Sequence, residues 1–70
     1  MTRYYVAIVN LLTNEETRFT QNINSWPEVV CIFRRLELSI RNNVNPQEIR
    51  LYKYGYHKQW EFITSSDNRP

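Results

Sequence analysis

Aromatic and basic residues alternate in the second half of the chain, in a pattern that could bind nucleic acid. Arg50, Tyr52 and Tyr54 are spaced two apart, so on a β-strand their side chains share one face. Tyr56 and Lys58 follow, in a segment that we expect to form a turn. Aromatic rings on an open sheet face stack against nucleobases, while arginine and lysine contact phosphates. These five residues are therefore our first candidates for a nucleic-acid or partner-binding surface.

A second basic group lies in a stretch that we expect to be helical. Arg34 and Arg41 are seven residues apart and share a helix face, with Arg35 beside them and Leu38 pointing the same way. This surface could contact phosphates or a protein partner. The alternative is a solvated helix face on which Arg34 or Arg41 pairs with Glu37.

No group of residues in the sequence is typical of an enzyme. Nucleophilic catalysis needs a thiol or hydroxyl beside an oriented base. Cys31 falls in the expected helix and His57 in a distant turn, so no local motif joins them. The acidic pair Glu15 and Glu16 lies in a polar turn without an apolar pocket to raise either pKa. We therefore expect no enzymatic activity and no catalytic residue.

Composition excludes several other classes of protein. A single Gly excludes the glycine-rich loops that hold phosphates, and one Cys with one His supplies too few ligands for a structural zinc site. We expect no cofactor and no metal. No stretch approaches twenty apolar residues and the N-terminus lacks a signal-peptide pattern, so we expect no membrane span and a cytoplasmic location. The net charge of +2 is too small for a strong nonspecific DNA binder.

The first part of the chain has the pattern of a β-hairpin. Residues 3–12 are apolar in both alternating sets, which predicts an interior strand covered in part on both faces. The polar residues 13–16 form the turn, and residues 17–23 alternate as a strand with one solvated face. Tyr4 or Tyr5 could join the aromatic residues of the later strands.

A helix over residues 26–42 follows. Ser25 can cap its first turn, with Glu28 reaching back to the Ser25 amide, and Pro27 is tolerated there. Asn42 or Asn43 can take the left-handed conformation that ends a helix. An apolar stripe at helical spacing consists of Val29, Phe33, Leu36 and Ile40.

Two further strands, over residues 49–54 and 60–64, complete the expected fold. We predict a single ββαββ domain over residues 1–65 and a polar C-terminal tail over residues 66–70. The class is α+β in two layers, with the helix on one face of a four-stranded antiparallel sheet. The other face of that sheet then has no cover within this chain.

Residues 45–62 carry a resemblance to a known family. Leu51, Tyr52 and Gly55, with Pro46 and Glu48 ahead of them, resemble a motif of the small nonstructural, DNA-binding protein of gokushovirus-type microviruses. That family also begins with a tyrosine-rich strand and has an arginine-bearing helix. The turn after the glycine is basic here where the family has an acidic one, and the proline-containing loop between the first two strands is absent. The resemblance implies a small phage accessory protein.

From these observations we expect a non-enzymatic, phage-type accessory protein that binds nucleic acid, single-stranded rather than duplex, through the aromatic and basic sheet face. The first alternative is a protein-binding inhibitor of a host or defence enzyme, similar to the anti-CRISPR proteins. The second is a homodimer in which two sheet faces pack together, because tyrosines are favoured in strands for packing alone.

Overall fold

The elements follow one another in the order that the sequence predicts. The computed structural model describes residues 2–55 and 58–69. Within them lie β1 (Arg3–Asn10), β2 (Glu15–Arg18), α1 (Trp26–Arg41), β3 (Gln47–Tyr54) and β4 (Trp60–Asp67). The predicted α+β class, with one helix and a four-stranded antiparallel sheet, is confirmed.

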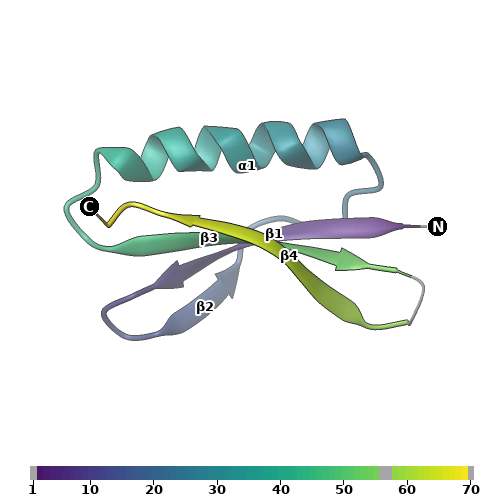
Figure 1. Ribbon diagram of the computed structural model, residues 1–70, viewed down its shortest axis with the longest axis horizontal. Helices are drawn as coiled ribbons and strands as arrows, with labels where there is room; N and C mark the ends of the chain where they lie inside the picture. The colour runs from purple at the N-terminus through teal and green to yellow at the C-terminus, as the bar shows by residue number, and fades with distance from the viewer. Residues whose placement is uncertain (1, 56–57, 70) are drawn as a thin grey trace.

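The four strands form one sheet in the order β2-β1-β3-β4, and α1 covers one of its faces (Figure 1). β1 is therefore an interior strand, as its two apolar faces predicted, and it pairs with β3 along its whole length. Their register places Val6 opposite Leu51 and Ile8 opposite Ile49. Because side chains alternate along a strand, these four residues share one face, which is the face under α1.

The hydrophobic core lies between α1 and the two central strands. Its buried side chains are Val6, Val29, Ile40, Ile49 and Leu51. Phe33 and Leu36 of the helix pack against them, so the predicted apolar stripe of α1 faces the sheet.

Local hydrogen bonds define the two ends of α1. The Ser25 side chain accepts a hydrogen bond from the Glu28 amide at 3.4 Å, as predicted, but the Glu28 side chain does not bond back to the Ser25 amide. The prediction of a left-handed residue at the other end is wrong, because Asn42 has a φ of −94° and Asn43 is not among the residues with positive φ. The carbonyl of Ile40 is instead satisfied by the Asn43 amide and by a distant side chain.

The second strand is shorter than predicted and begins earlier. β1 ends at Asn10 because Asn14, with a φ of 60°, closes a turn by donating its amide to the Asn10 carbonyl at 2.6 Å. β2 then stops at Arg18, because the Thr20 hydroxyl accepts the Val6 amide at 3.0 Å in place of a backbone partner. The chain rejoins β1 at a single bridge between residues 4 and 23.

The last strand is longer than predicted, and residues 66–69 are not a free tail. β4 pairs with β3 as far as Asp67, and Asn68 then bonds both to β3 and to the end of α1. Residues 64–66 are polar because the strand lies at the edge of the sheet, where most of their side chains are exposed. Polarity alone therefore does not mark the end of an edge strand.

Candidate nucleic-acid interface

The sheet face turned away from α1 carries aromatic rings from three strands. Strand alternation places them there, since their neighbours in β1 and β3 face the helix. We call this cluster the aromatic face; its members are Tyr5, Tyr52, Tyr54, Trp60 and Phe62. No other layer of the described chain lies over it (Figure 1).

The rings of the aromatic face pack against one another. Tyr5 stacks on Tyr52 with ring centroids 4.8 Å apart, and the ring of Trp60 meets that of Tyr5 edge-on at 4.6 Å. Trp60 also contacts Tyr54 at 5.2 Å, and Tyr52 contacts Phe62 at 6.0 Å. This packing leaves the tyrosines half-buried, whereas Phe62 is 57% exposed. Ring surface therefore remains available to a partner.

Arg18, on the edge strand β2, extends over the aromatic face. Its guanidinium carbon lies 4.2 Å from the ring centroid of Tyr5 and 5.5 Å from that of Trp60, which is a cation–π arrangement. Its side chain also donates to the Thr20 carbonyl at 2.9 Å and to Asn22. Within residues 2–55 and 58–69, Arg18 forms no ion pair with a carboxylate. Its positive charge therefore lies beside the rings without an acidic partner.

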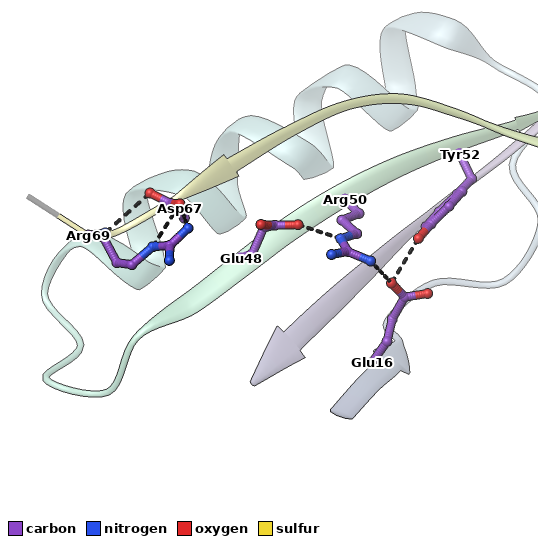
Figure 2. A network of polar contacts seen from close by, with 6 residues as sticks. All are labelled: Glu16, Glu48, Arg50, Tyr52, Asp67 and Arg69. Carbon is purple, nitrogen blue, oxygen red and sulfur yellow. Dashed lines mark hydrogen bonds and ion pairs between the residues drawn. The ribbon is translucent and has the colours of Figure 1, made fainter. Parts of the chain in front are cut away.

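Arg50, on the same face, is balanced by two carboxylates (Figure 2). Its Nε donates to Glu48, and its terminal nitrogen lies 2.8 Å from a carboxylate oxygen of Glu16. The Tyr52 hydroxyl donates to that same Glu16 oxygen at 2.8 Å. We call Glu16, Glu48 and Arg50 the ionic row. Alternation in the sequence places Arg50 on the correct face, but its two acidic partners reduce the charge that it can offer to a phosphate.

The whole sheet face turned away from α1 is called the open face, and the ionic row covers the part of it that the aromatic rings leave free. Ala7 and Val9 point away from α1, yet they are only 1% and 3% exposed. Ala7 lies opposite Arg50 and Val9 opposite Glu48 in the sheet register, so the longer side chains lie over the shorter ones. The open face is thus divided into a covered ionic half and an exposed aromatic half.

Burial and hydrogen bonding shift the protonation of the groups on this face. Burial raises the pKa of Tyr52 above its usual value, and the hydrogen bond to Glu16 raises it further. Burial is also the main cause that raises the pKa of Tyr5. The hydrogen bond to Glu48 is the main cause that raises the pKa of Arg50, and the hydrogen bond to Glu16 raises it further. Both phenols therefore remain protonated, and able to donate hydrogen bonds, at neutral pH.

Three other candidates come from the second hairpin, and the structure describes two of them. Tyr54 lies on the aromatic face, in contact with Trp60. Lys58 is exposed at the hairpin end, where its amide donates to the Gly55 carbonyl at 3.0 Å and its φ is 56°. Tyr56 lies outside the described residues.

The helix arginines lie on the other side of the molecule. Arg34, Arg35 and Arg41 are exposed on α1, and the sheet separates them from the aromatic face. The ion pair with Glu37 that was the alternative is not formed. An exposed Leu38 lies beside Arg34 and Arg35 in a shallow hollow. One extended strand on the aromatic face cannot contact these arginines at the same time, so the candidates divide into two separate surfaces.

The sequence pattern does not predict three residues of the site, which are Arg18, Trp60 and Phe62. It names Tyr5 only as an alternative to Tyr4, and Tyr4 instead packs against the core under α1. Trp60 and Phe62 are opposite Tyr54 and Tyr52 in the β3–β4 register, which a hairpin turn over residues 55–59 would have predicted. Tyr5 and Arg18 reach the aromatic face only through the pairing of β1 with β3 and β2. That pairing has no signal in the local pattern.

Three further features concern the described part of the chain. Its free cysteine, Cys31, is exposed on α1. Over residues 2–55 and 58–69, no three side chains of His, Cys, Asp or Glu gather to hold a metal ion. In the same residues, the helix is neither long nor apolar enough to cross a membrane.

Comparison with known protein families, with characterised proteins and with solved structures finds no match to this chain.

Proposed function

We propose that this protein binds single-stranded nucleic acid through the aromatic face, as a non-enzymatic accessory protein of the phage type. The observation that carries the proposal is the set of five aromatic rings on a sheet face that the helix leaves uncovered. Every nucleobase has a flat π-surface, so a row of rings binds bases with little dependence on sequence. A single strand can spread its bases over such a face, whereas the bases of a duplex stay stacked on one another.

Arg18 is the best-placed phosphate contact in this proposal. It lies over Tyr5 and Trp60 and has no acidic partner among the described residues. Arg3 is exposed opposite Tyr54, and Lys58 follows the same hairpin. Arg50 contributes by holding Tyr52 and Glu16 in place rather than by contacting phosphate.

The first experiment is a titration of a labelled oligothymidine with the protein at two salt concentrations, about 50 and 200 mM. Three phosphate contacts predict that the logarithm of the affinity falls with the logarithm of the salt concentration with a slope of about −2. Absence of binding at the lower salt concentration would refute the proposed function.

A matched pair of variants tests whether the aromatic face is the binding surface. Phe62→Ala removes a ring of this face, and Phe19→Ala removes a ring that is exposed to a similar extent, 55% against 57%, but lies in none of its ring contacts. We expect F62A to weaken oligothymidine binding by roughly tenfold and F19A to leave it unchanged. Equal effects of the two substitutions would assign binding to another surface.

The second candidate function is binding to a protein, either a host or defence enzyme or a second copy of this chain. The observation that favours it is the ionic row, where Glu16 and Glu48 neutralise Arg50 and make half of the open face unsuited to phosphates. Light scattering tests the homodimer. A dimer in the parent protein that becomes monomeric in F62A would favour this second candidate.

A further inference from the structure

A hollow of about 490 Å³ lies where the start of α1 meets the hairpin of β3 and β4. Its volume is within the usual range for small-ligand sites, about 300–1,000 Å³. Three aromatic, two charged and one aliphatic side chain line it: Tyr4, Trp26, Phe62, Lys53, Glu61 and Ile63. The rings of Tyr4 and Trp26 are 5.3 Å apart and tilted by 53°, so they form two walls of the hollow and leave ring surface exposed.

A β-bulge in β4 lies beside Phe62, the residue that the hollow shares with the aromatic face. Tyr52 pairs with Phe62 and Leu51 with Thr64, so Ile63 is an extra residue in β4. Phe62 both contacts Tyr52 on the aromatic face and lines the hollow. Tyr4, Lys53 and Glu61 alternate with the residues of the aromatic face, so the hollow lies on the α1 side of the sheet, beside the edge strand β4. A nucleic-acid strand on the aromatic face would therefore reach the hollow by passing around the edge of β4 at Phe62, where it can place a further base in the hollow.

The two charged side chains of the hollow have no partners in the described residues. Lys53 and Glu61 lie opposite each other in the sheet register and are both half-buried. Neither side chain forms a hydrogen bond or an ion pair with another described residue, although the two side chains lie on the same face of the sheet. A carboxylate with two free acceptor oxygens and an ammonium group therefore stand beside exposed rings.

From this chemistry we infer that the hollow binds a guanine base of the bound strand, an inference that rests on the proposed function. Guanine is the common base with two adjacent N–H donors on its pairing edge, and a carboxylate can accept both. Adenine, cytosine and thymine each present a single donor group on that edge. Glu61 accepts the guanine donors, Trp26 or Tyr4 packs on the ring, and Lys53 pairs with a phosphate of the same strand.

The two tryptophans allow each surface to be observed separately. Trp60→Phe leaves Trp26 as the sole tryptophan, in the hollow, and Trp26→Phe leaves Trp60, on the aromatic face. Each variant is titrated with an oligothymidine and with the same oligothymidine carrying one central guanine. We expect the guanine strand alone to change the fluorescence of Trp26, and both strands to change that of Trp60.

A charge-matched pair of variants then tests Glu61. Glu61→Gln and Glu15→Gln each remove one negative charge, but Glu15 is exposed in β2, away from the hollow. We expect the parent protein and E15Q to bind the guanine strand about tenfold more tightly than oligothymidine, and E61Q to bind both equally.

The possible failures are distinguishable. Equal affinity of the parent protein for the two strands, with a response of Trp60 to both, would overturn the guanine site and leave the proposed function intact. A guanine preference that persists in E61Q, or is lost equally in E15Q, would also overturn it. No response of either tryptophan to either strand would overturn both proposals.

Discussion

Replacing Asn68 with alanine should strongly destabilise the fold, although this residue lies only two positions from the end of the chain. The Asn68 amide nitrogen faces the carbonyls of Ile40, Asn43 and Asn45 at 2.8, 3.3 and 3.0 Å. Its amide oxygen accepts the Gln47 backbone amide at 2.8 Å. One side chain thus joins the end of α1, the following loop and the start of β3.

The size of the effect follows from the number of hydrogen bonds. The amide nitrogen has two hydrogens and can make two full bonds to its three acceptors, and the oxygen makes a third. At about 1 kcal/mol for each bond, the substitution lowers the free energy of unfolding by about 3 kcal/mol. A domain of this length has about 4–10 kcal/mol in total, so Asn68→Ala removes a large fraction of its stability. The melting temperature falls by about 10–25 °C.

Urea denaturation followed by tryptophan fluorescence measures this loss. Asn24→Ala is the matched control, because Asn24 is exposed and its side chain forms no hydrogen bond among the described residues. Asn68→Asp keeps an acceptor for Gln47 but turns oxygen toward the carbonyls of the helix end, so we expect it to be at least as destabilising as N68A at neutral pH. Equal stabilities of N68A and N24A would refute this account of the C-terminal segment.

Two further predictions concern the open face and the helix. Because the pKa of Tyr52 is raised in the folded state, the stability contributed by its neutral phenol is present below about pH 10 and is lost as the pH rises above this value. Denaturation midpoints at about pH 9 and pH 11 should therefore differ more in the parent protein than in Tyr52→Phe, and equal differences would contradict the raised pKa of Tyr52. Ser25→Ala removes the cap of α1 and should lower the free energy of unfolding by about 1 kcal/mol, whereas Ser25→Asp should retain most of it.

Much of the fold follows from local patterns in the sequence. The capping residue Ser25 and the apolar stripe of the helix identify α1, and alternation in β3 places Tyr52 and Tyr54 away from the core. Side chains return to the same face about every 3.6 residues in a helix and every two residues in a strand, and a cap lies next to the turn that it caps. Residues close in the sequence are therefore sufficient to predict these features. The ends of the strands are less predictable. β2 stops where Thr20 bonds to Val6, and β4 continues to Asp67 because distant backbone groups pair with it.

The sequence by itself therefore determined the class of fold, the helix and the side of β3 that carries its tyrosines. The tertiary structure decided which residues meet on that side. Tyr5 reaches Tyr52 through the register of β1 with β3, and Glu16 reaches Arg50 across 34 positions of the chain. The physical reason is that a local pattern sets the direction of a side chain, whereas its partner depends on strand pairing between segments that are far apart in the sequence. For this reason the predicted aromatic and basic sheet face gains the rings of Tyr5, Trp60 and Phe62, whereas its Arg50 is paired with two carboxylates.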